Sequence, residues 1–377
     1  MGSTPTSTHP TRAPAHAGGP ADLAGRQTRV RAALAAQDLP ALLVSQAENI
    51  RYLSGFTGEG LLLVTAADVR LLTDSRFTIQ AAQEAPDVIL VQRDPRQIPA
   101  LAAEVGALGV ARLGFEAQHL RYSQYEDLHT ALPQLALVPT RGLIDGQRAV
   151  KDAAELALIR RAVAIADQAF DEVSQEIRPG QTERQVARLI ETRMIDLGAE
   201  GPAFPLIVAA GPNSAMAHAV PSDRPIGAGE PLVIDMGARY QGYNSDMTRT
   251  LILGPPDAKF KEIYNIVLRA QLAGEFTARS GLSGHAIDAV TRTVIQNAGY
   301  GDHFGHGTGH GIGLEVHEPP RVSHTGSEAL IDDSVVISVE PGIYLEGWGG
   351  VRIEDLVLLH PSGAEVLTQA RKHHYYD

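Results

Sequence analysis

The chain contains no cysteine at all. It therefore has no disulfide framework, no thiol nucleophile and no thiolate metal ligand. This absence is compatible with a reducing cytoplasm, which is where we expect the protein to act. The composition is 44% hydrophobic over 377 residues, which predicts buried cores in about two globular domains.

Positive charge and long apolar runs are also scarce. The chain has 32 Lys and Arg against 44 Asp and Glu, a net charge of −12. Nucleic-acid-binding proteins usually carry a basic surface, so we expect no nucleic-acid partner. No apolar run approaches the length of a membrane span, so we expect no membrane association. Residues 1–22 lack the apolar core of a secretory signal and predict a disordered leader.

The first globular unit, residues 23–147, alternates predicted strands with helical segments. This alternation is typical of an α/β domain. Strands are predicted at residues 39–45, 60–65, 69–73, 88–91 and 113–116, and a helix at residues 98–106.

The second unit, residues 148–377, contains a faint internal repeat. Apolar residues at helical spacing predict a helix over residues 152–177, which Pro179-Gly180 ends. Thr182 begins another helix with Gln185 as its capping-box partner, and Gly198 stops it. The same pattern returns from Gly281, at an offset of 281 − 180 = 101. We therefore expect two related halves.

Each half also contains two strands that carry carboxylates. Asp235 lies in an apolar strand, and Asp246 begins the next strand after a tight connection. If the hairpin turns at Tyr240-Gln241, the two carboxylates face each other directly. Like charges in this arrangement destabilise a sheet unless they share a proton or bind a cation. An aspartate within an apolar run favours the cation.

The C-terminal half repeats this arrangement with glutamates. Glu340 ends the apolar strand 335–339, and Glu354 lies in the next strand, 351–359. Four carboxylates on two related hairpins can surround two divalent cations about 3.5–4 Å apart.

Histidines cluster in a glycine-rich segment between these hairpins. Residues 305–313 contain too many glycines for a helix interior, and they carry His306 and His310. An isolated histidine is more often a core or surface residue than a functional one. Three histidines between His306 and His317, with His218 upstream, favour a functional site.

These segments resemble the pita-bread metallopeptidases, which include methionine aminopeptidase, aminopeptidase P and prolidase. The resemblance covers about residues 150–377, through MAHAVPSDRP (216–225), VIDMGARYQGYNSDMTRT (233–250), HGTGHGIGLEVHE (306–318), SVEPGIY (338–344) and VRIED (351–355). The first unit, through NIRYLSGF (49–56), is similar to the N-terminal domain of the proline-specific branch. The resemblance implies an α/β (α+β) protein in which a creatinase-like domain precedes a pseudo-twofold pita-bread domain.

The resemblance also implies the ligands of two metal ions. Asp246 and Glu354 would bridge both ions, Asp235 would hold one, and His310 and Glu340 would hold the other. Oxygen-rich ligands with one imidazole suit Mn²⁺ best, with Co²⁺, Zn²⁺ or Fe²⁺ as alternatives.

The implied reaction is hydrolysis of the Xaa-Pro peptide bond with release of the N-terminal residue. Glu340 would take the proton of the attacking water and pass it to the leaving nitrogen. His218 and His317 would stabilise the oxyanion. His306 and Arg352 would lie around the ligands and serve substrate binding.

The length of the substrate is left open by the sequence. An Xaa-Pro dipeptidase must bind the free C-terminal carboxylate, and Arg51 is a candidate for this task, set against the alternative of an exposed strand arginine. On length alone we favour the dipeptidase (prolidase) over an aminopeptidase P that takes longer peptides. The expected partners are proline-containing di- or oligopeptides and a second copy of the chain in a homodimer. A catalytically silent pita-bread protein that binds peptides or partners is the alternative of another class, and the intact ligand set argues against it.

Overall fold

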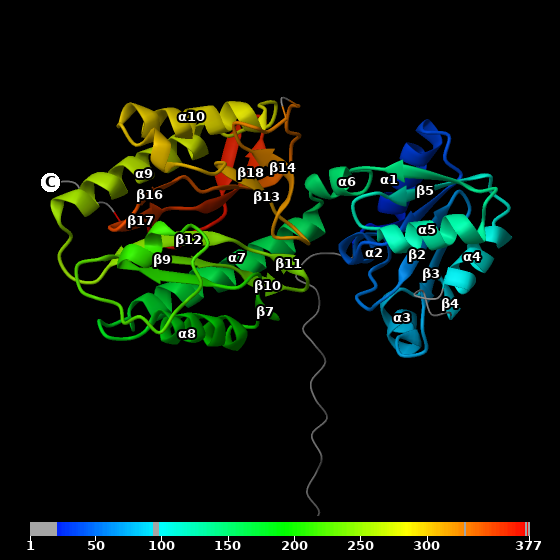
Figure 1. Cartoon of the computed structure of the whole chain (residues 1–377), viewed down its shortest axis with the longest axis horizontal. Helices are drawn as coiled ribbons and strands as arrows, with labels where there is room; N and C mark the ends of the chain where they lie inside the picture. The colour runs from blue at the N-terminus through cyan, green and yellow to red at the C-terminus, as the bar shows by residue number, and fades with distance from the viewer. Residues whose placement is uncertain (1–20, 93–97, 328, 374, 376–377) are drawn as a thin grey trace, which may run out of the picture.

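The computed structural model describes residues 21–92, 98–327, 329–373 and 375. Two bodies lie side by side and are joined by the short helix α6 (Asp145–Ala149) (Figure 1). The predicted leader lies outside the described residues except for Ala21 and Asp22. The Asp22 carboxylate accepts a hydrogen bond from the Gly25 amide and caps helix α1 (Leu23–Ala36). Among the described residues, no helix combines the length and apolar character needed to cross a membrane.

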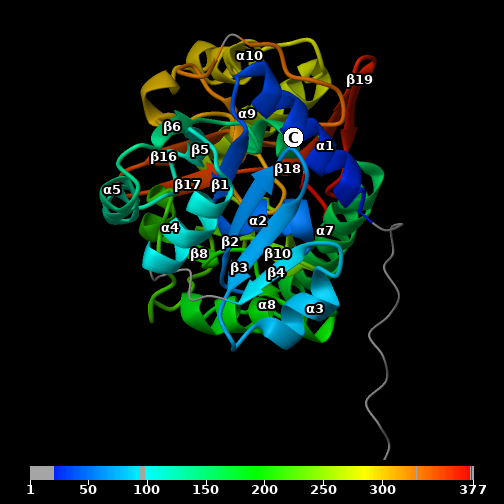
Figure 2. The same cartoon turned by 90° about the vertical axis from the view of Figure 1, so that its right-hand side faces the viewer.

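The N-terminal domain is a six-stranded sheet between two layers of helices, in the strand order β4-β3-β2-β1-β5-β6. The strands are β1 (Ala41–Val44), β2 (Leu61–Thr65), β3 (Val69–Thr73), β4 (Ile89–Gln92), β5 (Arg112–Glu116) and β6 (Ala136–Thr140). The helices after α1 are α2 (Ala47–Ser54), α3 (Thr78–Glu84), α4 (Ile98–Ala107) and α5 (Tyr122–Ala131). The five predicted strands and the predicted helix are confirmed, with ends that shift by a few residues. Figure 2 shows this domain in front of the other body.

Alternation along the strands produces the two layers. Leu42 and Val44 pack in one core cluster with Val30 of α1, whereas Leu43 packs in another with Leu101 of α4. Successive side chains of a strand point to opposite faces, so an apolar strand needs cover on both sides. The α/β class expected for this unit follows from that burial.

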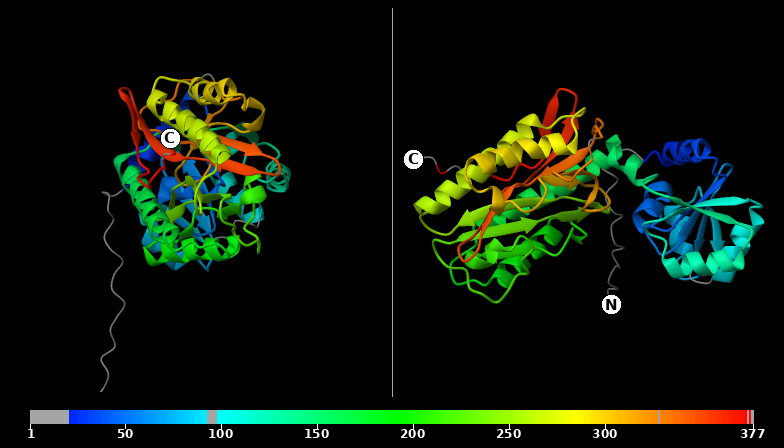
Figure 3. Two further views of the ribbon diagram at one scale, coloured as in Figure 1. Left: turned by 90° about the vertical axis from the view of Figure 1, so that its left-hand side faces the viewer. Right: turned by 45° about the horizontal axis from the view of Figure 1, so that its top comes forward.

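The C-terminal domain places its strands between two pairs of helices (Figures 1 and 3). The first half contains α7 (Ala153–Ser174), α8 (Glu183–Asp196), β7 (Gly201–Pro202), β8 (Ile207–Ala210), the 3₁₀ helix η1 (Gly211–Ala215), β9 (Pro231–Met236), β10 (Ala238–Tyr240), β11 (Tyr243–Asn244) and β12 (Met247–Ile252). The second half contains α9 (Ala258–Thr277), α10 (Gly284–Asn297), η2 (Gly301–His303), β13 (Gly309–Gly311), β14 (Glu318–Val322), β15 (Val336–Val339), β16 (Gly342–Leu345), β17 (Gly349–Arg352), β18 (Asp355–His360) and β19 (Gly363–Val366).

The internal repeat is confirmed by helices α8 and α10. Both have 14 residues, and their first residues are 183 and 284, an offset of 284 − 183 = 101. The Thr182 and Ser283 hydroxyls cap these helices. Each accepts a hydrogen bond from the backbone amide three residues later, that of Gln185 and of Ala286 respectively. Gly198 and Gly299 follow their ends with φ of 101° and 86°, the left-handed conformation that favours glycine.

The register predicted for the first carboxylate hairpin is wrong. Asp235 pairs with Thr248, not with Asp246, and Arg239 pairs with Asn244. The turn lies one residue later than predicted, at Gln241-Gly242, where both φ values are positive (46° and 78°). A two-residue turn of this kind needs positive φ at both central positions, and glycine at the second favours this placement.

This slip leaves both carboxylates on the same face of the hairpin. The pairing moved by two residues, and side chains alternate with a period of two. Asp246, which just precedes β12, therefore becomes a diagonal neighbour of Asp235 instead of its direct partner.

Candidate metal centre

The predicted ligands come from two bent hairpins and the strand between them. Asp235 lies in β9 and Asp246 just before β12, whereas Glu340 follows β15 and Glu354 precedes β18. His310 lies in β13. In the second hairpin, Val339 pairs with Asp355 and Gly342 with Arg352, so one register continues across Glu340 and Glu354.

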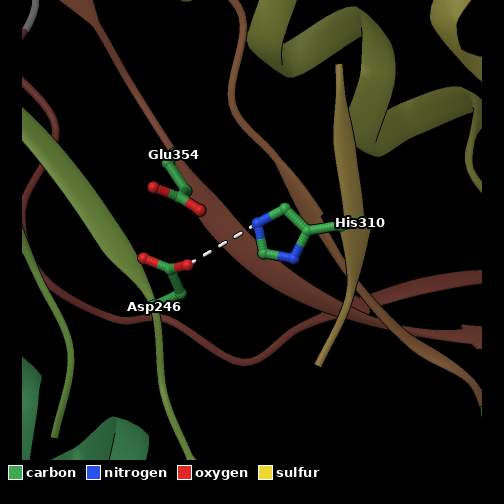
Figure 4. Close-up of side chains that lie close together, drawn as sticks. All are labelled: Asp246, His310 and Glu354. Carbon is green, nitrogen blue, oxygen red and sulfur yellow. Dashed lines mark ion pairs between the residues drawn. The ribbon is translucent and has the colours of Figure 1, made fainter. Parts of the chain in front are cut away.

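Their side chains converge. The His310 Nε2 atom lies 3.2 Å from Glu340 Oε1 and 3.7 Å from Asp246 Oδ2. Asp246, His310 and Glu354 point toward one another, and each offers a ligand atom within 4.8 Å of the others (Figure 4). Such a spacing lets one small cation contact all three.

Two buried carboxylate oxygens test whether a cation fits. Asp235 Oδ1 and Glu354 Oε1 have no hydrogen-bond partner among the described residues. An unpaired buried carboxylate oxygen is costly, and a divalent cation would satisfy it. The donor set of four carboxylates and one imidazole suits such an ion, so the residues fit the metal that the sequence predicts.

The electrostatics of the group point the same way. Burial, reinforced by neighbouring carboxylates, raises the pKa of Asp246 and of Glu354 well above the usual range. Burial also raises the pKa of Asp235, although Arg352 opposes this. For Glu340, the effect of burial is outweighed by the hydrogen bond and charge of His310, which lower its pKa to about 2. The site thus gathers carboxyl groups whose ionised forms are unfavourable together and would be stabilised by a cation.

Arg352 supports the ligands from behind. Its guanidinium donates hydrogen bonds to Asp235 Oδ2 (2.6 Å), Thr248 Oγ1 (3.0 Å), Tyr344 Oη (2.7 Å) and the Ala217 carbonyl (3.2 Å). Thr248 in turn donates to Glu354 Oε2 (2.7 Å). These contacts orient two of the predicted metal ligands, Asp235 and Glu354, and the expected role of Arg352 in substrate binding stays a prediction.

The other histidines lie around the same centre. His306 Nε2 is 2.9 Å from the Tyr344 hydroxyl, and its Nδ1 is 2.8 Å from the Gly307 carbonyl. The ring centroid of the exposed His317 lies 4.2 Å from that of His310. His218, exposed in the loop after η1, contributes electrostatically to the lowered pKa of both His306 and His317. The predicted catalytic and substrate-binding histidines are therefore near the ligands, and their roles stay predictions.

Arg51 lies at the contact between the domains. It belongs to helix α2 and is half-buried, so the alternative of an exposed strand arginine is wrong. Its Nη2 donates a 2.6 Å hydrogen bond to the Gln241 carbonyl at the hairpin turn. Recognition of a substrate carboxylate by Arg51 remains a prediction.

Arg321 is a residue that the sequence reasoning missed. It lies in β14 directly opposite His310, it is exposed, and its charge contributes to the lowered pKa of His317. Within the described part of the chain, no carboxylate lies within 4.0 Å of its guanidinium. Nothing in the neighbouring sequence identifies it, because its position depends on the pairing of β13 with β14.

Both parts of the chain match the models of known protein families. The model of metallopeptidase family M24 matches residues 157–361, and that of the creatinase/prolidase N-terminal domain matches residues 26–150. The chain is 38% identical to an Xaa-Pro dipeptidase from Pyrococcus horikoshii over 336 residues, which cover 89% of this chain and 94% of the relative.

Two solved structures are similar over nearly their whole length. An Xaa-Pro dipeptidase from Bacillus anthracis has a TM-score of 0.90 and 39% identity, and the match covers 94% of this chain and 99% of that chain. An X-Pro aminopeptidase from Thermotoga maritima has a TM-score of 0.87 and 37% identity, and the match covers 93% and 99%.

Proposed function

Because the chain belongs to metallopeptidase family M24 and carries a creatinase/prolidase N-terminal domain, we propose that it is a metal-dependent Xaa-Pro dipeptidase. The observation that carries this proposal is the convergence of Asp246, His310 and Glu354, with Glu340 3.2 Å from His310, beside the buried oxygens of Asp235 and Glu354 that lack a partner among the described residues. We place the division between the N-terminal and catalytic domains at residues 147 and 148.

The metal ions supply a polarised carbonyl and an activated water when bound. We propose two ions, preferably Mn²⁺, held by Asp235, Asp246, His310, Glu340 and Glu354. Although burial acts in the opposite direction, the hydrogen bond and charge of His310 lower the pKa of Glu340 to about 2, so this carboxylate is ionised at neutral pH. We propose that it accepts the proton of the attacking water. Proline's tertiary amide nitrogen must be protonated to leave, and Glu340 is the group that returns the proton to it.

We propose that His218 and His317 stabilise the developing oxyanion. Partial desolvation and the neighbouring charge of His310 lower the pKa of His317, which favours a neutral imidazole whose N–H can donate a hydrogen bond. Hydrogen bonds with the Tyr344 hydroxyl and the Gly307 carbonyl fix the His306 ring. We propose that His306 contributes to substrate binding.

The preference for dipeptides needs a cation that reads the free carboxylate of proline. Arg321 fits best, because it is exposed, lies opposite His310 and has no carboxylate within 4.0 Å among the described residues. Arg51 is the second candidate, with one of its donors already used on the Gln241 carbonyl. A guanidinium fork matches a carboxylate in shape and charge.

The test measures release of the N-terminal residue from Ala-Pro, Ala-Pro-amide and Ala-Pro-Gly after Mn²⁺ reconstitution. We expect Ala-Pro to be the best substrate. Arg321→Gln should reduce kcat/KM on Ala-Pro about 10- to 100-fold, which corresponds to loss of one charge-assisted contact, and should change Ala-Pro-amide little. Arg51→Gln is the matched variant that separates the two arginines.

Each outcome has a clear meaning. Comparable rates on Ala-Pro-Gly would overturn the dipeptidase preference in favour of an X-Pro aminopeptidase. A protein that binds no metal and releases no N-terminal residue would overturn the enzyme itself. We further propose that the protein is a cytoplasmic homodimer, which light scattering and cell fractionation would check.

A further inference from the structure

Arg148 joins three segments at the junction of the two domains. Its side chain is only 1% exposed. One nitrogen, Nη1, donates to Asn49 Oδ1 of the N-terminal domain (2.9 Å). The other, Nη2, donates to Glu315 Oε2 (3.0 Å) and Glu318 Oε2 (2.5 Å) of the catalytic domain. One guanidinium therefore links helix α2, its own helix α6 and the segment that precedes and begins β14.

The two glutamates lie on either side of His317. Glu315 is two residues before it, and Glu318 follows it directly. Lys151 binds the remaining oxygen of Glu318 at 2.7 Å, and the side chains of Lys151 and Glu318 are 0% and 1% exposed. Both flanks of His317 are thus fixed by cations from the domain junction, while its ring lies 4.2 Å from that of His310.

The hydrogen-bond network of Arg148 extends into the N-terminal domain through Asn49. Asn49 donates to Glu116 Oε1 at 2.7 Å, and Glu116 ends strand β5. Glu116 also accepts hydrogen bonds from the Ser45 and Gln46 amides at the start of helix α2. A continuous polar chain therefore runs from the sheet of one domain to the loop that carries His317 in the other.

Stability alone is a weak reason for such a cluster. The attraction within a buried ion pair is largely offset by the cost of desolvating its charges. Well-packed apolar side chains in the same place often give a fold of equal or greater stability. What a buried pair does supply is a fixed geometry, and a displacement of about 1 Å in an active site can reduce a rate about 10²-fold.

We propose that Arg148 is a positioning residue that holds His317 beside His310 through Glu315 and Glu318. The docking of the N-terminal domain then sets the place of this histidine directly. The kinetic part of this inference rests on the proposed function, because it uses His317 as a group that serves the reaction.

The first experiment compares Arg148→Lys and Glu315→Gln with Arg26→Lys. Arg26 is a matched control, since it is a 2% exposed arginine at the same junction whose ion pairs go to Asp152 (2.7 Å) and Glu155 (3.2 Å). We expect Arg148→Lys and Glu315→Gln to lower kcat on Ala-Pro about 10- to 100-fold, with KM and metal content nearly unchanged.

Glu315 is 34% exposed, so Glu315→Gln should fold normally and still tests the proposal if Arg148→Lys folds poorly. Arg26→Lys should change kcat less than threefold, and an equal loss there would overturn the proposal.

A double-mutant cycle separates positioning from a general structural effect. If Arg148 acts through His317, then adding Arg148→Lys to His317→Ala should cost no further kcat. A full additional loss in that background would overturn the proposal.

A readout without turnover completes the test. In metal-free protein labelled at histidine, Arg148→Lys should shift the His317 ring signals, assigned with His317→Ala, while Arg26→Lys should leave them in place. Unshifted signals would overturn the positioning role. If the wild-type protein cleaves no Xaa-Pro peptide, the proposed function fails, and the ring signals still decide whether Arg148 positions His317.

Discussion

At the scale of single residues, the proposed metal ligands destabilise the metal-free fold. Asp235, Asp246 and Glu354 are buried near one another, and burial raises the pKa of each. Binding sites commonly oppose stability in this way, because charges gathered for a ligand lack compensation without it.

Asp246→Asn should therefore stabilise the metal-free protein while it abolishes metal binding and activity. The amide keeps the shape and removes a carboxylate that repels Glu354 and Asp235. We expect a gain of about 1–2 kcal/mol at pH 7.5, or roughly 2–6 °C in melting temperature. Thermal unfolding in a chelator, and again with Mn²⁺, measures both effects.

The exposed Asp127 provides the control for that experiment. Asp127→Asn should leave the metal-free melting temperature and the stabilisation by Mn²⁺ unchanged. A lower metal-free melting temperature for Asp246→Asn than for the wild type would contradict the interpretation of the site as a charge cluster.

At the scale of elements, the two hairpins show how a turn sets the position of a ligand. Gly242 has φ of 78°, and a Cβ atom there would lie 2.1 Å from Arg51 Nη1. Gly347, in the corresponding turn of the second hairpin, has φ of 76° with no atom within 4 Å of such a Cβ. The two glycines share a backbone requirement, and Gly242 alone of this pair also makes room for the other domain.

Gly242→Ala should cost more stability than Gly347→Ala. Both changes place a side chain at positive φ, which costs about 1 kcal/mol or more. Gly242→Ala must also displace Arg51 from the Gln241 carbonyl, a charge-assisted contact that adds about 1 kcal/mol. Denaturant unfolding measures the difference, and it should vanish when both changes are made in an Arg51→Met background.

Much of this architecture could be predicted from the sequence, because periodicity and caps are local. The offset of 101 residues, the Thr182 cap and the face shared by Asp235 and Asp246 all follow from local patterns. The register of the first hairpin could not be fixed, because alternation determines the face but not which residues pair. Arg321 was missed because its position opposite His310 depends on the pairing of β13 with β14, and no local sequence pattern predicts that pairing.

At the scale of the whole molecule, the metal-free protein should lose stability as the pH rises from 6.5 to 8. Burial raises the pKa of Glu275 to about 7, and raises those of Asp246 and Glu354 as well. Such groups bind protons more tightly in the folded state, so their contribution is largest below the ordinary carboxyl pKa and falls as the pH rises through the folded pKa. His306 and His317, with lowered pKa values, act in the opposite sense mainly below 6.5.

Metal should reverse this dependence. The ligands must be deprotonated to bind, so the affinity for Mn²⁺ rises with pH. Melting curves at several pH values, with a chelator or with a fixed Mn²⁺ concentration, should therefore diverge between pH 6.5 and 8. Parallel curves would show that the raised pKa values do not belong to the metal site.

The 101-residue repeat also has a consequence for ancestry. A chain with a single repeat carries one hairpin and two carboxylates, which is half of the metal centre. Two such chains would complete the centre only by meeting around a twofold axis, at a rate that depends on their concentration. The short stretch Gly254–Pro256 between β12 and α9 makes that meeting intramolecular, as a gene duplication with fusion would. Within one chain the two halves need not be identical, and they differ here in the histidine strand β13 and in the use of aspartates in one hairpin and glutamates in the other.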